Sequence, residues 1–346
     1  MAKRWMKSFF TKAMQRQVGA LTRNALRAGK KASQLATKVP TRKRKRKSAV
    51  PATNHWRTGI AASPGGLRRY HLFHPTGKLP SSRIPLVVML HGCGQDARSF
   101  ATSTHMNRLA ASAGFMVLYP EQDRVANVQG CWNWFDTRSG RALREATSIL
   151  SVVDHICATY PVDARRVVVA GMSAGASMAA LIALHHPERF LAVAMHSGIG
   201  PGMAESTATA LTAMRGRIPK SATSLHAPAT PLPALLVIQG NRDTVVAPSN
   251  GALAAQRWAA TVGAKAVAPR TVQRGTRYAV TLYEWKVGRR AFATLAEVAG
   301  LGHAWSGGAA TQAFSDPAGP DASRMVWAFA QREHTLRGAA RTMQAG

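Results

Sequence analysis

Short apolar segments alternate with longer helical ones along most of the chain. The apolar segments that we expect to form strands are residues 70–74, 84–90, 115–119, 166–170, 191–196, 234–239, 278–284 and 293–298. The expected helices are residues 107–113, 141–160, 173–185, 251–262 and 322–333. Strands that alternate with helices in this way are typical of an α/β fold. The pattern therefore predicts a mostly parallel sheet with helices on both faces.

Charge divides the chain into unequal parts. Residues 1–50 hold sixteen Lys or Arg and no acidic residue, so they carry +16 of the formal net charge of +31. We interpret them as a basic N-terminal extension and linker, followed by one large α/β domain over residues 51–335 and a flexible tail over 336–346. Within the domain, residues 199–232 are rich in Pro, Ser, Thr and Ala. This segment is an expected insertion, either a lid or substrate wall or a disordered surface loop.

The strongest chemical signal is Gly-Met-Ser-Ala-Gly at residues 171–175, between the strand at 166–170 and an Ala-rich helix. This G-x-S-x-G pattern in a strand–turn–helix setting is typical of a nucleophile elbow, which exposes a serine hydroxyl to a base. Ser173 is therefore the candidate nucleophile. The alternative is a turn of small residues where a helix packs tightly on a sheet.

Asp243 is the candidate acid. It follows the buried strand 234–239, and open parallel sheets place their sites at the carboxyl ends of strands. Three competing acids lack that setting: Glu205 lies in the Ser/Thr/Ala-rich segment, and Glu284 and Glu297 lie within expected strands. The alternative for Asp243 is a solvated turn residue.

His303 is the candidate base, because it lies in a glycine-rich loop at residues 300–308, between an expected strand and helix. The chain order Ser, Asp, His is that of the α/β-hydrolases. His196 is the strongest competitor, since it closes the strand 191–196, but it precedes Asp243 in the chain. In a triad, Asp243 would orient the imidazole that removes the proton of Ser173.

The loop after the strand 84–90 completes the expected site. It reads His-Gly-Cys-Gly-Gln at residues 91–95. The N–H groups of Cys93 and Ala174 are the expected oxyanion-hole donors, and His91 is expected to fix the loop structurally. Trp305, Trp132 and Trp134 are expected to line the acyl or polymer groove, with core packing as the alternative.

Together these motifs resemble the esterase family that includes polyhydroxybutyrate depolymerases and the related acetylxylan and feruloyl esterases. The matching segments are residues 91–95, 118–122, 131–135, 169–176, 240–243 and 302–308. The resemblance implies an α/β-hydrolase fold and serine esterase chemistry through an acyl-enzyme. It implies a poly- or oligo-(3-hydroxyalkanoate) as substrate, or an acylated polysaccharide for a feruloyl or acetylxylan esterase. A peptidase is a less favoured reading, and a non-catalytic granule- or polyanion-binding protein is the alternative of a different class.

Composition adds expectations about partners and compartment. Apolar residues at helical spacing among the Lys and Arg of residues 1–47 suggest a basic amphipathic helix on an anionic surface, such as a granule, membrane or nucleic acid. A disordered tail without a partner is the alternative. Because the N-terminus lacks the apolar core of a secretory signal, we expect a cytoplasmic protein that attaches to a surface through its N-terminal helix. Secretion is the alternative, since members of the family are commonly secreted.

Cysteine and motif usage bear on redox state and cofactors. Cys93 and Cys131 lie in motif loops that could meet, and they would pair in an exported protein but remain thiols in a reducing cytosol. Cys157 is expected to be a small core residue. With no Cys/His cluster at metal-ligand spacing and no phosphate-binding glycine loop, we expect neither a cofactor nor a metal.

Overall fold

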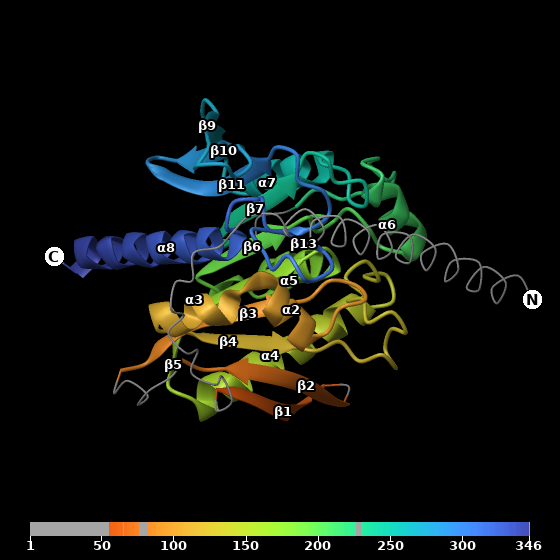
Figure 1. Cartoon of the computed structure of the whole chain (residues 1–346), viewed down its shortest axis with the longest axis vertical. Coiled ribbons are helices and arrows are strands. Elements are labelled where there is room, and N and C mark those ends of the chain that lie inside the picture. The colour runs from red at the N-terminus through yellow and green to blue at the C-terminus, as the bar shows by residue number, and fades with distance from the viewer. Residues whose placement is uncertain (1–54, 65, 76–81, 226–229, 346) are drawn as a thin grey trace, which may run out of the picture.

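In a computed structural model, the structure describes residues 55–64, 66–75, 82–225 and 230–345. The basic extension over residues 1–50, with its expected helix, lies outside these residues. Within them, eleven strands form one sheet in the order β1-β2-β4-β3-β5-β6-β7-β11-β10-β8, with β9 pairing β10 (Figure 1). The strands are β1 (Trp56–Ser63), β2 (Gly66–Phe73), β3 (Ile84–Leu90), β4 (Met116–Pro120), β5 (Val162–Met172), β6 (Ala192–His196), β7 (Ala234–Gly240), β8 (Lys265–Ala266), β9 (Arg270–Val272), β10 (Val280–Val287) and β11 (Arg290–Val298).

The central strands run parallel and the outer ones antiparallel. All pairs from β4 through β3, β5, β6 and β7 to β11 are parallel, whereas β1, β2, β8, β9 and β10 pair antiparallel with their neighbours. Every residue of β3, β4, β6 and β7 is buried. Continuous apolar strands of this kind need helices on both faces. The predicted α/β class with a mostly parallel sheet is therefore confirmed.

The helices form two layers. One face packs against α4 (Arg141–Thr159), α5 (Ala174–His185) and α7 (Ser249–Ala260), with Ile149, Met178 and Trp258 in its core. The other packs against α2 (Ala97–Thr104), α3 (Met106–Ala113) and α8 (Ala322–Ala345), with Phe100 and Trp327. A 3-10 turn at Pro187–Arg189 and α6 (Thr207–Met214) lie in connections, and β12 (Trp305–Ser306) pairs β13 (Ser315–Asp316) in a separate two-stranded sheet.

Several short elements were not predicted, and two of them, β1 and α2, lack a run of apolar residues. Strand β1 is an edge strand on which Ala61 is the single buried position, so it has no hydrophobic run. Helix α2 is rich in Ser and Thr and begins with a capping box, in which the Asp96 carboxylate accepts from the N–H of Ser99. Its attachment to the core comes from Phe100, which is fully buried. Residues 207–214 of the expected insertion form α6, capped by Ser206.

The flexible tail expected over residues 336–346 is wrong for most of its length, because α8 continues to Ala345. No proline interrupts this stretch, and Leu, Ala, Arg, Met and Gln, which make up most of it, are good helix formers. The Arg337 guanidinium also donates to the carbonyls of Phe190 and Leu191 at 3.1 and 3.2 Å. These bonds tie the helix to the chain just before β6. Figure 1 shows α8 running outward from the sheet towards the C-terminus.

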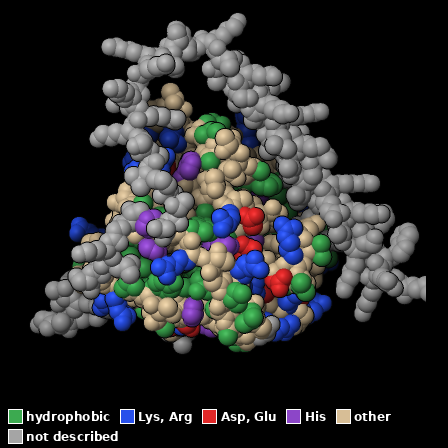
Figure 2. All heavy atoms as spheres, turned by 60° about the horizontal axis from the view of Figure 1, so that its bottom comes forward, with side chains coloured by type: hydrophobic (Ala, Val, Ile, Leu, Met, Phe, Trp, Pro, Cys, Tyr) green, Lys and Arg blue, Asp and Glu red, His purple; other side chains and the backbone are tan. Residues whose placement is uncertain are grey.

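The described surface keeps the basic character of the sequence. Figure 2 shows Lys and Arg side chains scattered over one face, with few acidic side chains between them. Among the described helices, none is both long and apolar enough to cross a membrane.

Candidate active site

The parallel register gathers the motif loops at one edge of the sheet. Strands β3, β5, β6, β7 and β11 are consecutive neighbours, and all point the same way. The segments that follow their carboxyl ends therefore lie at the same edge. Those segments carry the loop 91–95, Ser173, Asp243 and His303.

Ser173 sits on a sharp turn between β5 and α5. Its backbone has φ 55° and ψ −121°, a conformation that side-chain-bearing residues rarely adopt and that marks strained functional turns. Both flanking glycines are required by packing. A Cβ at Gly171 would clash with the backbone of Gly175, and a Cβ at Gly175 would clash with the carbonyl of Leu90. The turn is therefore an elbow pressed against β3, as the motif predicts.

The structure brings the candidate acid and base together. Asp243 Oδ2 lies 2.8 Å from His303 Nδ1, and the side chain of Asp243 is fully buried. The same carboxylate accepts from the N–H groups of Val245 and Val246, each at 2.9 Å. Burial opposes ionisation, but these hydrogen bonds and the charge of His303 outweigh it, so the pKa of Asp243 is lowered. The carboxylate is thus ionised at neutral pH and oriented towards the imidazole.

His196, the competing base, has a different position. Its ring is buried, stacks on Trp305 with centroids 5.0 Å apart, and accepts from the N–H of Ser306 at 3.1 Å. Burial, aided by the charge of His303, lowers the pKa of His196 to about 3. Its Nδ1 lies 3.1 Å from the Ser197 hydroxyl. With both ring nitrogens engaged, His196 is a neutral structural histidine.

The loop after β3 lies against the elbow. A Cβ built at Gly92 would lie 3.5 Å from the Cβ of Ser173. The N–H of Gly92 donates to Gln95 Oε1 at 3.0 Å, and that of Gly94 donates to the carbonyl of Gln129 at 2.9 Å. Among the described residues, the N–H of Cys93 between them has no acceptor. The N–H of Ala174 likewise has none, as expected in the first turn of a helix.

His91 fixes this loop. Its Nδ1 donates to the carbonyl of Gly92 at 2.9 Å, and its Nε2 accepts from the N–H of Gln122 at 3.2 Å. Its carbonyl accepts from the indole N–H of Trp132 at 3.0 Å. A disulfide between Cys93 and Cys131 joins the same two segments. The loop is thus anchored to residues 122–132 at several points.

A buried polar network behind these anchors was missed in the sequence. Gln122 Nε2 donates to Glu145 Oε1 at 2.9 Å, and the N–H of Asn133 donates to Glu145 Oε2 at 2.8 Å. Arg68 donates to Gln122 Oε1 at 2.8 Å, and its guanidinium lies 5.5 Å from the Trp132 ring centroid. One feature of the sequence does indicate such a network: Glu145 lies on the same buried face of α4 as Ala142, Ala146 and Ile149. A charged residue on an apolar helix face needs buried partners.

The expectation that three tryptophans line a substrate groove is wrong for Trp132 and Trp305. Their exposed fractions are 0% and 1%. Trp132 is held on His91, and Trp305 lies between His196 and Phe100. Trp134 keeps 9% of its surface exposed and belongs to the core over α4 and α5. Core packing, the alternative left open by the sequence, describes all three.

The described residues contain no group of three His, Cys, Asp or Glu side chains that could hold a metal ion. The side chains gathered at this edge are instead those of acid–base and nucleophilic chemistry.

Comparison with known proteins decides the family. The family model described as "Esterase PHB depolymerase" matches residues 68–274. The chain belongs to this family. Its relatives include poly(3-hydroxyalkanoate) depolymerase C of Paucimonas lemoignei, 32% identical over 202 residues, which are 56% of this chain and 48% of that protein.

Other relatives of this family member carry different names. Feruloyl esterase B of Neurospora crassa is 33% identical over 144 residues, covering 41% of this chain and 47% of that protein. Acetylxylan esterase A of Talaromyces purpureogenus is 27% identical over 198 residues, covering 51% and 50%. The matched part thus spans about half the length of these relatives.

The fold agrees with the family. Acetyl xylan esterase from Aspergillus awamori superposes with a TM-score of 0.56 at 22% identity, covering 68% of this chain and 89% of that one. The α/β-hydrolase fold that the sequence predicted is therefore confirmed.

Proposed function

We propose that this protein is a serine esterase that hydrolyses carboxylic esters through an acyl-enzyme. The observation that carries the proposal is the 2.8 Å hydrogen bond between Asp243 and His303 at the sheet edge where the elbow presents Ser173. Family membership and the α/β-hydrolase fold support it. Ser173 is the proposed nucleophile, His303 the base and Asp243 the orienting acid.

The reaction proceeds in two steps. His303 Nε2 removes the proton of Ser173 as the hydroxyl oxygen attacks the ester carbonyl, and Asp243 stabilises the charged imidazolium through Nδ1. The N–H groups of Cys93 and Ala174 donate to the oxyanion that forms, and each donor of this type lowers the barrier by roughly 3–4 kcal/mol. His303 then protonates the leaving alcohol. A water activated by His303 attacks the acyl-enzyme and releases the acid.

For the substrate we propose a poly- or oligo-(3-hydroxyalkanoate), with a feruloyl or acetylated xylan ester as the second candidate. The depolymerase relative and the two esterase relatives support one candidate each. A panel of hydroxybutyrate oligomers, feruloyl esters and acetylated xylan, compared by kcat/KM, discriminates them. Preference for either polysaccharide ester over the oligomers would overturn the first choice.

Substitution of the nucleophile tests the reaction itself. Ser173→Ala should abolish hydrolysis of p-nitrophenyl butyrate and labelling by a fluorophosphonate probe, while circular dichroism stays unchanged. Ser82→Ala, the same change at an exposed position before β3, is the matched control. Labelled Ser173→Ala protein, or undiminished turnover, contradicts the assignment of Ser173 as the nucleophile. A wild-type protein that neither hydrolyses the ester nor reacts with the probe favours a non-catalytic granule- or polyanion-binding protein.

We also propose that residues 1–47 bind an anionic surface, since residues 1–50 carry sixteen Lys or Arg and no acidic residue. Deleting them should reduce binding to polyester granules or anionic vesicles without changing turnover of soluble esters. Equal binding by the shortened chain would exclude this role.

For location, the Cys93–Cys131 disulfide favours the secreted alternative over the cytoplasmic one, because disulfides persist in oxidising compartments. Mass analysis of native protein from culture fluid and from cells tests this choice.

A further inference from the structure

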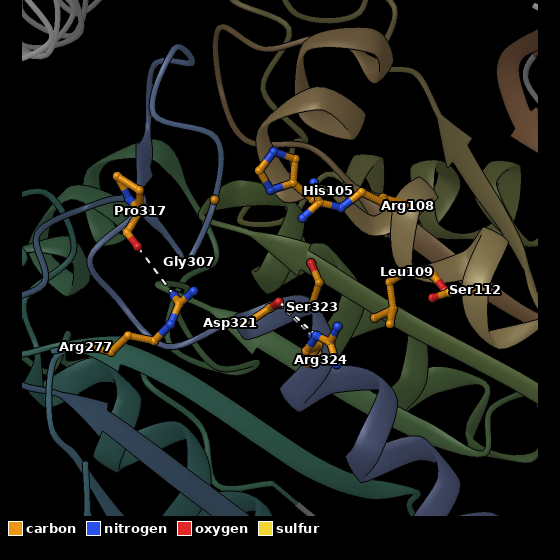
Figure 3. A pocket seen from close by; sticks show the side chains of 11 residues that line it. His105, Arg108, Leu109, Ser112, Arg277, Gly307, Pro317, Asp321, Ser323 and Arg324 are labelled. Carbon is orange, nitrogen blue, oxygen red and sulfur yellow. Dashed lines mark hydrogen bonds and ion pairs between the residues drawn. The ribbon is translucent and has the colours of Figure 1, made fainter. Parts of the chain in front are cut away.

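A cavity lies against the end of the loop that carries His303. Figure 3 shows it between α3, the segment before β10 and the first turn of α8. Its volume is about 430 Å³, which is within the range of small-molecule sites, roughly 300–1,000 Å³. Gly307 and Gly308 form part of the wall.

Three guanidinium groups from separate segments line this cavity. Arg108 comes from α3, Arg277 from the segment before β10, and Arg324 from α8, with His105 at the rim beside Arg108 (Figure 3). The one carboxylate of the lining, Asp321, pairs with Arg324 at 3.4 Å. The lining therefore carries a net charge of about +2 if His105 is neutral.

The arginines keep donors free for a ligand. Arg277 donates through Nη1 to the carbonyls of Gly319 and Pro317, which leaves its Nη2 and Nε without a partner among the described residues. The Arg108 side chain has no ion pair or hydrogen bond within the described chain. A guanidinium is a planar fork of N–H donors that suits oxyanions.

We infer that this cavity binds the phosphate group of a small phosphate monoester. A phosphate dianion matches the net charge of the lining, and its oxygens can accept from several guanidinium N–H groups at once. The volume leaves room for an organic part beyond the phosphate. Nothing in this inference depends on the esterase chemistry, because Ser173, Asp243 and His303 are not part of the lining.

A ligand bound in this cavity would also contact the loop at residues 300–308, which carries His303. Gly307 has φ 71°, its N–H donates to the carbonyl of Asp316 at 2.8 Å, and it follows His303 by four residues. A Cβ at Gly307 would come within 2.6 Å of Asp321 Cα, so the loop and the first turn of α8 are in close contact. An occupant of the cavity therefore bridges α3, α8 and this loop.

Arginine footprinting on the full chain locates the ligand. Phenylglyoxal modification is followed by peptide mass analysis at constant ionic strength, with glycerol 3-phosphate, inorganic phosphate or glycerol added. We expect glycerol 3-phosphate to protect Arg108, Arg277 and Arg324 but not Arg289, and glycerol to protect none. Arg289 is an exposed internal control in the β10–β11 turn, at the opposite end of β10 from Val280. Protection by inorganic phosphate at equal concentration identifies the free ion, rather than the ester, as the ligand.

Binding constants of variants test the same site. Arg108→Gln should weaken glycerol 3-phosphate binding about tenfold, and Arg277→Gln with Arg324→Gln about a hundredfold, since a charge-assisted hydrogen bond contributes about a factor of ten or more. Arg289→Gln should leave the constant unchanged. Arg108→Gln serves if the double variant misfolds, because its side chain holds no described contact. Equal constants in all variants, or equal protection of Arg289, would overturn the inference.

Discussion

The main-chain carbonyl of His196 accepts a hydrogen bond from the N–H of Ser173 at 2.9 Å. The imidazole of the same residue accepts from the N–H of Ser306, three residues after His303. One residue at the end of β6 therefore contacts both the nucleophile turn and the loop of the base. We interpret His196 as a positioning residue that sets the distance between them.

Replacing the ring should loosen the base loop without touching the reacting atoms. His196→Phe keeps the stacking on Trp305 but leaves the buried N–H of Ser306 without an acceptor, which costs about 1–3 kcal/mol in the free energy of unfolding. We expect a fall in kcat with little change in KM for a soluble ester. His196→Gln, which restores an acceptor, should recover part of kcat. Equal kcat in His196→Phe and the wild type would refute the positioning role.

His196 should also make the protein less stable in acid. The unfolded chain protonates this histidine below a pKa of about 6.5, whereas the folded protein keeps it neutral until about pH 3. The unfolded state therefore binds more protons between these values, so the free energy of unfolding falls as pH decreases, by up to about 1.4 kcal/mol per pH unit. Urea unfolding between pH 7 and 4.5 measures this effect. The free energy of unfolding should fall less steeply with decreasing pH in His196→Phe than in the wild type. An unchanged slope would show that His196 does not titrate differently on folding.

The orienting acid can be tested by removing its charge alone. Asp243→Asn keeps the shape of the side chain but loses the carboxylate that fixes the tautomer of His303. We expect kcat for p-nitrophenyl butyrate to fall roughly 10³- to 10⁴-fold, with the fold retained. Glu188→Gln, the same carboxyl-to-amide change at an exposed position, should leave kcat unchanged. A drop of less than tenfold in Asp243→Asn would argue against the triad.

The sequence sufficed for features that depend on chain order and strand direction. Asp243 and His303 are sixty residues apart, yet each follows a buried strand, and parallel strands bring such ends together. No comparable rule predicts in which direction the side chain of a loop residue points. Trp305 is a neighbour of the base in the chain, but its ring turns into the core against Phe100. Adjacency in sequence therefore gave the wrong role.

The partners in buried polar pairs were also not predictable from the sequence. Arg68 lies on β2 and Gln122 in the segment after β4, and no periodicity of the sequence indicates that this arginine meets that glutamine. The position of Glu145 on a buried helix face does indicate that partners exist. It does not say which ones, because they come from the irregular segment 122–133.

Two glycine substitutions should have opposite effects on stability. Gly175→Ala forces a methyl group against the carbonyls of Leu90 and His91, so α5 must shift, and overpacking of this kind costs about 1–3 kcal/mol. Gly338→Ala in α8 meets nothing within 4 Å and replaces a poor helix former, which should stabilise the protein by about 0.5–1 kcal/mol. Urea unfolding measures both. No loss of stability in Gly175→Ala would contradict the packing described for the elbow.

The disulfide should support both the stability of the protein and the oxyanion loop. Cys93 and Cys131 are 38 residues apart, and closing a loop of this length stabilises the folded state by about 4 kcal/mol on the chain-entropy estimate. Cys131→Ala removes this restraint while the hydrogen bond of Trp132 to His91 remains. We expect a lower midpoint in urea, and a fall in kcat that exceeds any change in KM, because the N–H of Cys93 would lose its fixed direction.

Cys157→Ala is the matched control, since Cys157 is the free cysteine of the described chain and is half-buried away from the loop. It should lose stability through packing alone and keep the wild-type kcat. Treating the wild type with dithiothreitol should reproduce the kinetic effect of Cys131→Ala, and the reductant should have no further effect on that variant. If reduction leaves kcat unchanged while thiol titration shows the bond to be open, the remaining contacts of His91 suffice to hold the oxyanion donor.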